Sequence, residues 1–373
     1  MDISPPNLPT GELHVLCDTS QKCEEALLVL RSSPVLILDC EGQDLGVVGG
    51  ALSIITLRTT TANPQTYLID AKSLSTTTLN DVFDLLSSTK IQKVVFDGRA
   101  DFSAFYHEYG IELYNVLDMQ LVDIKSREAR EEKSEEQLKR LCGAFAPREI
   151  WKNRDLYEQV HKLSSLGKCL REHQCMRSED GSDLRPKGME APCSRQATAD
   201  LVIVDHQDWM ERPLSSEYLN YAARDALLIH NLFDAFKAVG WTRLLSLEES
   251  MRYVTFHKYS QPKAEDQYKH HSLLPLGILN PPFRKCVSCE RELPFESFAM
   301  ADSGGECYVC TAITRRMKDE TRPSAGGAHR EGSSKTKAQI IAEEEEAPVH
   351  SKAKEGVSPD GEFQIIYQVV TSY

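Results

Sequence analysis

The sequence predicts an α/β protein whose mixed sheet is flanked by helices, and three observations support this prediction. Three apolar runs follow one another between residues 35 and 70, with only turn-like linkers between them, which is typical of antiparallel neighbours. Helix-like and strand-like segments alternate between residues 79 and 117, as they do where helices cover a sheet. Hydrophobic residues make up 41% of the 373 residues, which allows a core but indicates that part of the chain does not fold.

The N-terminal part of the chain supplies the predicted sheet. Residues 1–12 are proline-rich and are expected to be flexible, so that structure begins near Leu13. We expect strands over residues 13–15, 35–39, 52–57, 66–70, 93–96 and 115–117. We expect helices over residues 20–31, 79–88 and 101–109, the first with Ser20 at its N-cap.

Two further helices and an insertion are expected in the next part of the chain. Residues 126–140 are highly charged and are predicted to be helical. A strong helix is predicted from Ser216 to Val239, with Ser215 as its cap and Gly240 at its end. An insertion over roughly residues 145–200 lies between them, and its polar part, residues 171–200, is interpreted as a loop. Residues 13–260 would together form one domain.

The chain after residue 260 is expected to contain a linker, a small module and a tail. Prolines mark a linker over residues 261–283, and a cysteine cluster occupies residues 284–312. Residues 313–373 are predicted to be largely disordered, because residues 318–360 are charged and poor in aromatic side chains. The apolar run over residues 363–370 receives no assignment.

Charge and cysteine content narrow the class of protein. The net charge of −13 argues against coating nucleic acid through overall charge, although a local basic groove remains compatible with it. The N-terminus does not resemble a signal peptide, and no apolar run reaches the length of a membrane span. The 11 cysteines are therefore expected to be thiols or metal ligands in a reducing compartment, nucleus or cytoplasm, with no membrane partner.

A pair of acids ends the apolar run that begins at Val35. Alternation along a strand places Asp39 and Glu41 on one face, while Cys40 points to the opposite face and is expected to pack in the core. Buried carboxylates are costly unless a cation compensates them, and a convergent pair suits Mg²⁺ or Mn²⁺. Taken alone, however, such a pair at a strand end is more often solvated.

Two later segments strengthen the metal interpretation. Asp101 opens the helix after the strand over residues 93–96, where an acid is also common as a cap. Tyr221 and Asp225 are four residues apart and face one side of the late helix. An ion pair with a nearby arginine is the alternative explanation for Asp225.

These residues together resemble the DEDDy 3′–5′ exonucleases, in the branch of ribonuclease D and the Werner-type exonuclease domain. The core of the resemblance is Asp39-Cys40-Glu41, Asp101 and Tyr221-x-x-x-Asp225. The supporting segments are Asp44-Leu45-Gly46 to Leu52-Ser53-Ile54-Ile55, Leu117-Asp118-Met119-Gln120-Leu121, and Trp209-x-x-Arg212-Pro213-Leu214 followed by Tyr218. The resemblance covers about residues 13–240, and the Gly-rich segment after Glu41 is most similar to the eukaryotic exonuclease-domain-containing relatives.

The resemblance implies a ribonuclease-H-like fold and a two-metal site. Asp39, Glu41 and Asp225 would bind the first Mg²⁺ or Mn²⁺, and Asp39 would bridge to the second. Asp101 would hold the second ion through water, and Tyr221 would orient the attacking water. Two divalent ions suit an in-line displacement at a phosphodiester.

The sequence departs from the family pattern in two places. Phe96 and Asp97 stand where ribonuclease D relatives often have a histidine and a small residue, which leaves the four acids intact. The insertion over residues 145–200 is missing from compact members of the family, so access of substrate to the site is left open.

A second metal site is predicted by the cysteine cluster. Two Cys-x-x-Cys pairs, Cys286 with Cys289 and Cys307 with Cys310, are separated by 17 residues, which is the spacing of a structural Zn²⁺ site. Four thiolates would close the tetrahedron and leave no position for catalysis. Basic residues surround the cluster, and they would contact either phosphate or solvent.

The sequence therefore predicts a metal-dependent 3′–5′ exonuclease that acts on single-stranded ends of RNA or DNA. Two other interpretations remain open. The chain would be a catalytically silent nucleic-acid-binding or scaffold protein with the same fold, since fold alone does not establish activity. It would otherwise be an adaptor that binds a protein partner through the zinc module or the tail. The presence of all four acids and Tyr221 favours the enzyme.

Overall fold

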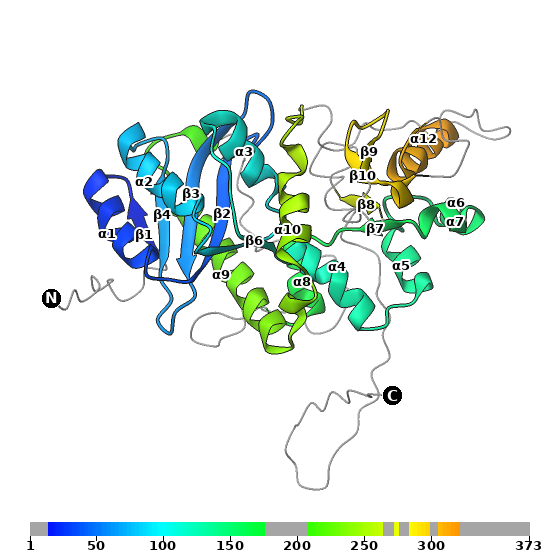
Figure 1. Ribbon diagram of the computed structural model, residues 1–373, viewed down its shortest axis with the longest axis horizontal. Helices are drawn as coiled ribbons and strands as arrows, with labels where there is room; N and C mark the ends of the chain where they lie inside the picture. The colour runs from blue at the N-terminus through cyan, green and yellow to red at the C-terminus, as the bar shows by residue number, and fades with distance from the viewer. Residues whose placement is uncertain (1–13, 176–207, 264–271, 276–282, 299–304, 321–373) are drawn as a thin grey trace, which may run out of the picture.

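The computed structural model describes residues 14–175, 208–263, 272–275, 283–298 and 305–320. Its largest sheet has six strands in the order β1-β4-β3-β2-β5-β6 and lies in the left half of the view in Figure 1. The strands are β1 Val15–Cys17, β2 Val35–Gln43, β3 Ala51–Thr59, β4 Thr66–Asp70, β5 Gln92–Val95 and β6 Val116–Asp118. Strands β2, β3 and β4 are antiparallel neighbours, whereas the pairs β1–β4, β2–β5 and β5–β6 are parallel. The predicted mixed sheet is confirmed.

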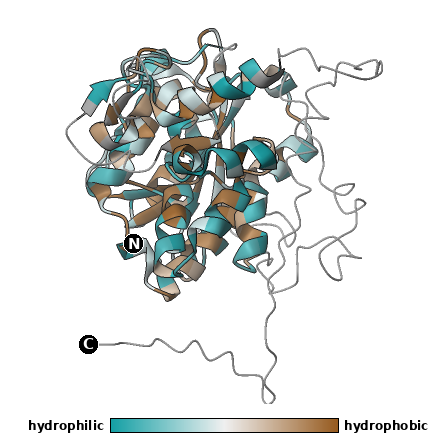
Figure 2. Ribbon diagram, turned by 90° about the vertical axis from the view of Figure 1, so that its right-hand side faces the viewer, coloured by the Kyte–Doolittle hydropathy of each residue, from teal (hydrophilic) through white to brown (hydrophobic). Residues whose placement is uncertain are grey.

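Helices cover both faces of this sheet. One face is covered by α1 Ser20–Leu30, α2 Thr76–Leu86 and α3 Arg99–Tyr109, which share a hydrophobic cluster with Leu36 and Leu38. Helix α9, Ser216–Ala238, packs on β2, β3 and β4 from the other side. Strand alternation assigns the intervening positions of β2, including Asp39 and Glu41, to the face that α9 covers. Figure 2 shows the apolar strands at the centre, enclosed by helices that carry hydrophilic segments.

The ends of helices α9 and α1 lie within one residue of the positions that the sequence predicts. Helix α9 has Ser215 at its N-cap position, as the sequence predicts, although the Ser215 side chain makes no capping hydrogen bond. Gly240 follows its C-cap with a φ of 80°, also as predicted. In helix α1 the cap lies one residue earlier than expected, because Thr19 and not Ser20 is the N-cap. The side chain of Thr19 accepts a hydrogen bond from the backbone N–H of Lys22.

The charged segment over residues 126–140 is helical, as predicted, and is divided between two helices. Helix α4 is Met119–Ala129 and helix α5 is Ser134–Arg140. Glu131 lies between them with a φ of 55°, which ends a right-handed helix. The α4 helix also starts earlier than expected, because the side chain of Asp118 caps the N–H groups of Gln120 and Leu121.

Much of the expected insertion is folded. Residues 147–172 form three short helices and a strand, which are α6 Pro147–Lys152, α7 Arg154–Tyr157, β7 Val160–Lys162 and α8 Leu166–Glu172. The loop predicted over residues 171–200 therefore starts later, and residues 176–207 lie outside the described part of the chain. These helices and this strand could not be predicted from the sequence, because they are short and their apolar side chains contact distant segments.

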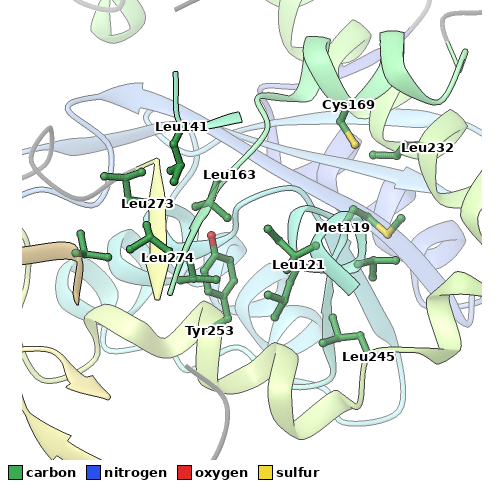
Figure 3. Packing of buried hydrophobic residues seen from close by; sticks show 14 of the residues in the cluster. Met119, Leu121, Leu141, Leu163, Cys169, Leu232, Leu245, Tyr253, Leu273 and Leu274 are labelled. Carbon is green, nitrogen blue, oxygen red and sulfur yellow. The ribbon is translucent and has the colours of Figure 1, made fainter. Parts of the chain in front are cut away.

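The expected linker over residues 261–283 contains a strand of what we call the second lobe, which comprises the folded insertion over residues 147–172, this strand and the cysteine module; the six-stranded sheet with its helices is the first lobe. Strand β8, Leu273–Pro275, pairs antiparallel with β7, and Leu273 and Leu274 are buried. Helix α10, Leu247–Val254, joins the two lobes. Its buried Tyr253 lies in the same hydrophobic cluster as Leu121, Leu163 and Leu274 (Figure 3).

The cysteine module shares that cluster and is not a separate core. It comprises β9 Phe283–Lys285, β10 Glu292–Pro294 and α12 Tyr308–Glu320, and its Leu293 and Val309 belong to the cluster that runs through α4, α8 and β8. Helix α12 continues past the expected boundary at residue 312. Residues 321–373, with the unassigned apolar run, lie outside the described residues. Within the described part of the chain, no helix is long and apolar enough to cross a bilayer.

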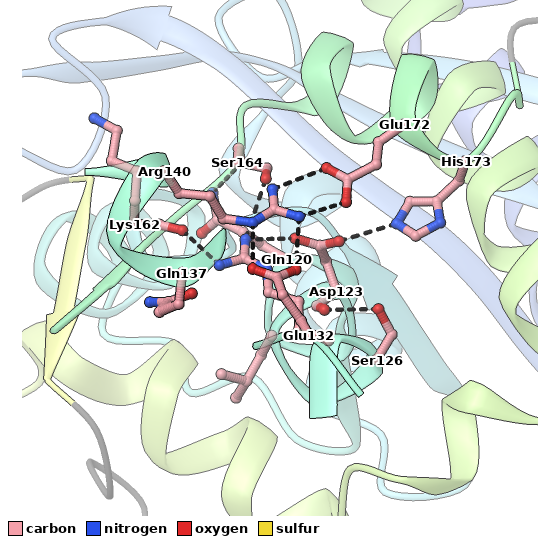
Figure 4. Close-up of polar contacts among 12 residues, drawn as sticks. Gln120, Asp123, Ser126, Glu132, Gln137, Arg140, Lys162, Ser164, Glu172 and His173 are labelled. Carbon is pink, nitrogen blue, oxygen red and sulfur yellow. Dashed lines mark hydrogen bonds and ion pairs between the residues drawn. The ribbon is translucent and has the colours of Figure 1, made fainter. Parts of the chain in front are cut away.

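A buried polar network fixes α4, α5 and α8 to one another (Figure 4). The carboxylate of Asp123 accepts hydrogen bonds from Arg127 at 2.8 Å and from His173 at 3.0 Å. Arg140 bridges Glu132 and Glu172, with contacts of 2.6 to 2.9 Å. Burial alone would raise the pKa of Asp123, but the hydrogen bond from His173 and the charge and hydrogen bond of Arg127 hold it far below its usual range.

The Asp123→Asn substitution should therefore destabilise the protein strongly. It leaves the buried guanidinium of Arg127 without its anion, and breaking a buried pair in this way costs about 3–5 kcal/mol. The free energy of unfolding in urea measures the effect. Asp18→Asn, which breaks the exposed pair with Lys22, is the matched control and should cost less than about 1 kcal/mol. Equal losses in the two variants would contradict this assignment.

Candidate active site

The site is built where β2 runs on beyond its parallel neighbour. Strand β2 pairs with β5 only from Val35 to Ile37, because β5 ends at Val95. Asp39 and Glu41 follow, and they pair on the other side with β3, opposite Thr56 and Ile54. The edge of β2 that β5 leaves free is therefore open to residues from the β5–α3 turn and from α3.

Helix α9 brings the last acid to the same place. Its small side chains Ala222, Ala223 and Ala226 are buried, which lets the helix approach the sheet closely. Carboxylate oxygens of Asp39, Glu41 and Asp225 consequently all lie within 4.8 Å of one another. Three acids that the sequence separates by almost 190 positions thus form one cluster.

Burial and mutual repulsion disfavour the charged forms of these acids. Desolvation, followed by the charges of Asp101 and Asp225, raises the pKa of Asp39 well above its usual value. The pKa of Glu41 is raised in the same way, by desolvation and then by the other carboxylates. Desolvation raises the pKa of Asp225 to about 6. A divalent cation would relieve this repulsion, and donors that are all carboxylate oxygens suit Mg²⁺ or Mn²⁺.

Asp101 reaches the cluster from the other side of the sheet and is not among the three closest acids. It sits in the first turn of α3, is 5% exposed and acts electrostatically on Asp39. Desolvation raises its pKa to about 7, while a hydrogen bond from the Cys40 thiol opposes the shift. Its Oδ1 is buried without a hydrogen-bond partner, as expected of an atom that binds a cation or a water molecule on a cation. Cys40 therefore packs in the core, as predicted, and also contacts an acid of the site.

The turn before Asp101 is held by residues that the sequence analysis did not assign to the site. The carboxylate of Asp118 accepts hydrogen bonds from the backbone N–H groups of Asp97 at 3.3 Å and Gly98 at 2.8 Å. Asp97, whose φ is 58°, forms an ion pair of 2.5 Å with Arg99, and that guanidinium lies 4.8 Å above the ring of Tyr253. Asp97, which departs from the family pattern, thus stabilises this turn. In the sequence, only the nearby Arg99 indicates that Asp97 has a partner.

The glycine-rich linker closes against the same turn. Gly46 has a φ of 74°, and a Cβ there would clash with the backbone carbonyl of Ala100. The hydroxyl of Ser103 donates to the carbonyl oxygen of Gly46 at 2.5 Å. The segment after Glu41 is therefore fixed beside Asp101.

An ion pair anchors the entry to α9. Arg212 donates to both carboxylate oxygens of Asp70 at the end of β4, each at 2.7 Å, and to the carbonyl of Trp209 at 2.9 Å. Trp209 is fully buried, with its ring 4.9 Å from that of Tyr218 and 6.2 Å from that of Tyr221. The Trp-x-x-Arg segment thereby orients the start of α9, and its partner Asp70 carried no sequence signal.

Tyr221 is a neutral phenol beside the acids. Desolvation and the neighbouring charge of Asp225 raise its pKa above the usual value, and its hydroxyl hydrogen-bonds to Asp225. A group that keeps its proton can align a water molecule but is a poor general base.

The four cysteines of the second predicted site also converge. Their sulfurs lie within 4.8 Å of one another, with contacts of 3.7 Å between Cys286 and Cys310, 3.6 Å between Cys307 and Cys310, and 4.0 Å between Cys289 and Cys307. Tetrahedral bonds of about 2.3 Å to Zn²⁺ place sulfurs about 3.8 Å apart. The cluster therefore has the dimensions of a structural zinc site.

A third group, Asp123, Cys169 and His173, has ligand-type atoms within the same distance. Asp123 is already paired with Arg127, and Arg130 lies 3.9 Å away. Two guanidinium groups would repel a cation, so this cluster is part of the network that fixes α4 and α8.

Comparison with known proteins identifies the class. Residues 15–174 match the family model described as 3′-5′ exonuclease. The chain therefore contains a region that matches the 3′–5′ exonuclease family, and this match supports a hydrolase of that class. The resemblance to this family that the sequence indicated is confirmed. The match ends before α9, so the positions of Tyr221 and Asp225 rest on the tertiary structure.

Several solved structures are similar to this chain at low identity. A complex of Trypanosoma brucei RNase D with RNA U12 is 19% identical, over 79% of this chain and 90% of that one, with a TM-score of 0.48. Escherichia coli RNase D is 18% identical, over 65% and 50%, with a TM-score of 0.36. The Aedes aegypti Nibbler EXO domain is 18% identical, over 66% and 98%, with a TM-score of 0.35. No curated protein sequence matches the chain significantly.

The electrostatics of the acid cluster predict an unusual pH dependence. Because the pKa of Asp225 is raised to about 6 and that of Asp101 to about 7, the folded protein binds more protons than the unfolded chain between about pH 4 and 7. Without free divalent cations, these acids should therefore make stability fall as the pH rises through that window, and Mn²⁺ should restore it. Thermal unfolding at several pH values measures this contribution.

The Asp225→Asn variant should show a weaker fall and a smaller stabilisation by Mn²⁺ than the wild type. Asp234→Asn, on the exposed side of the same helix, should behave like the wild type. If Asp225→Asn retained the full response to pH and Mn²⁺, the cluster would not be a cation site.

Proposed function

We propose that this protein hydrolyses phosphodiester bonds at the 3′ end of single-stranded RNA or DNA with two Mg²⁺ or Mn²⁺ ions. The observation that carries the proposal is the cluster of Asp39, Glu41 and Asp225, with the unsatisfied Oδ1 of Asp101 beside it. Buried carboxylates without enough compensating charge are expected to be neutralised by metal ions. The family match to residues 15–174 supports the reaction class.

Each residue of the acid cluster would have a distinct role in the proposed reaction. Asp39, Glu41 and Asp225 would hold one cation, with Asp39 shared between two, and Asp101 would contact the second through water. Bound cations would neutralise the phosphate and lower the pKa of a water molecule. Tyr221 would position that water through its hydroxyl, while Asp225 keeps the phenol in place. Arg212 and Arg99 would maintain the elements that carry these groups.

The four-cysteine cluster would bind one structural Zn²⁺ and stabilise the second lobe. All four sulfurs would be ligands, so this ion would take no part in the reaction. The lobe shares its hydrophobic cluster with α4 and α8, so loss of the ion would loosen the folded insertion as well. A protein partner could be bound by this module or by the tail.

The proposal predicts metal-dependent shortening of 3′ ends. Purified protein is incubated with 5′-labelled single-stranded RNA and DNA, and products are resolved by length. We expect a ladder with Mg²⁺ or Mn²⁺, none with EDTA, recovery after excess Mg²⁺ or Mn²⁺, and none with Asp39→Ala.

Asp225→Asn should lower the rate by about 10³-fold, which corresponds to the several kcal/mol that a bound metal ion supplies. Asp234→Asn is again the matched control and should keep the wild-type rate. Binding of the strand without any shortening, under several metals, would favour a silent nucleic-acid-binding protein instead.

The Tyr221→Phe variant tests the role of the phenol. Loss of the hydroxyl should lower kcat by on the order of 10²-fold through misplacement of the water, with little change in KM. Tyr259→Phe, at a side chain that is 83% exposed, is the control and should leave kcat unchanged. A wild-type kcat in Tyr221→Phe would remove this residue from the mechanism.

A further inference from the structure

Arg291 occupies an unusual position between the cysteine cluster and the exonuclease domain. It follows the first Cys-x-x-Cys pair, and its carbonyl oxygen accepts a hydrogen bond from the backbone N–H of Cys286 at 2.9 Å. The residue is only 8% exposed, although arginine is rarely buried without an anionic partner. The features around its guanidinium explain why the burial is tolerated.

The edge of the guanidinium points at two of the sulfurs. Its Nε donates to Sγ of Cys289 at 3.1 Å, and its Nη2 donates to Sγ of Cys307 at 3.9 Å. Neutral thiols would compensate a buried cation poorly, whereas thiolates would compensate it well. A centre of four thiolates and one Zn²⁺ carries a net charge of about −2, so a guanidinium in contact with it is electrostatically favourable.

The face of the guanidinium lies against the other lobe. It is 5.1 Å from the centre of the Phe256 ring, within the range of a cation–π contact. Phe256 belongs to the short 3₁₀ helix η3, Thr255–His257, which directly follows α10. Arg291 is thus in contact with the sulfurs by its edge and with the exonuclease domain by its face.

The segment that Arg291 contacts also holds the helix of Asp101. The carbonyl oxygen of His257 lies 2.8 Å from Nε2 of His107 on α3, and Lys258 forms an ion pair of 2.6 Å with Glu112 just after α3. Contacts therefore continue from the cysteine sulfurs through Arg291 and η3 to α3.

We propose that Arg291 is the residue that joins the metal-loaded four-cysteine centre to the exonuclease domain. Its N–H···S hydrogen bonds stabilise the thiolates of Cys289 and Cys307, and its stacking on Phe256 fixes η3 and the adjacent α3. This proposal rests on the proposed Zn²⁺ site, and is independent of whether RNA or DNA is the substrate. Residues that hydrogen-bond to metal ligands typically contribute about 10- to 100-fold in metal affinity.

The test compares full-length Arg291→Met and Arg291→Lys with Arg284→Met. Arg284 lies on the same hairpin, and its guanidinium stacks on Phe298 at 3.7 Å, so it controls for loss of a packed arginine. Zinc affinity is measured by chelator competition, and Co²⁺ replaces Zn²⁺ to report the sulfur ligands by their charge-transfer absorption. Arg291→Met should bind zinc about 10- to 100-fold more weakly and shift the cobalt band. Arg291→Lys should recover part of the affinity, and Arg284→Met should keep the wild-type band.

Hydrogen exchange of residues 253–258 provides the readout of coupling. In the zinc-loaded protein, exchange there should be faster in Arg291→Met than in the wild type, and faster also in Phe256→Leu, whose zinc affinity should be unchanged. Wild-type affinity, cobalt spectrum and exchange in Arg291→Met would overturn the proposal. A wild-type protein that binds neither Zn²⁺ nor Co²⁺ would overturn it too, through the zinc site, while cleavage of 3′ ends would still be judged by the nuclease assay.

Discussion

The confinement of like charges to one buried place is the constraint on which the rest of the site depends. Asp39, Glu41 and Asp225 lie within a few ångströms of one another, where desolvation already disfavours their charged forms. Repulsion among these carboxylates opposes the packing of α9 on the strand that carries Asp39 and Glu41. The structure resists this because Arg212 fixes the start of α9 to Asp70, and because small alanine side chains let the helix pack tightly on the sheet. Packing energy thus maintains an electrostatically unfavourable arrangement, which protonation or a bound cation would relieve.

The fourth acid is held by a different set of interactions. Asp101 arrives from α3, on the opposite face, and reaches the cluster because β5 stops before the acids of β2 begin. The turn before Asp101 is stabilised by the carboxylate of Asp118, which accepts hydrogen bonds from two backbone N–H groups of the turn. The ion pair of Asp97 with Arg99 stabilises it further. Two independently anchored elements therefore meet at the C-terminal half of β2, so the acid positions respond to changes on either face of the sheet.

The four cysteines belong to the second lobe and do not form a separate domain. The insertion after α5 provides β7, the returning chain provides β8, and the cysteine module packs on both through one hydrophobic cluster. A zinc site in this place would stabilise a lobe that is continuous with α4 and α10. The module is linked to α3 through η3, because Arg291 lies over the ring of Phe256 and η3 contacts α3.

The sequence by itself determined the mixed sheet, the late helix with its cap, the identity of the acids and the spacing of the cysteines. These features are local, because strand alternation, capping and Cys-x-x-Cys spacing are set by neighbouring residues. Only the tertiary structure decided which acids meet, that Asp101 stands apart from the closest three, and that residues 147–172 fold with β8. It also revealed the long-range contacts of Asp70 with Arg212, of Asp118 with Gly98 and of Arg291 with Cys307, which join residues 16 to 142 positions apart in the sequence. Such contacts depend on the packing of distant segments, which no local pattern records.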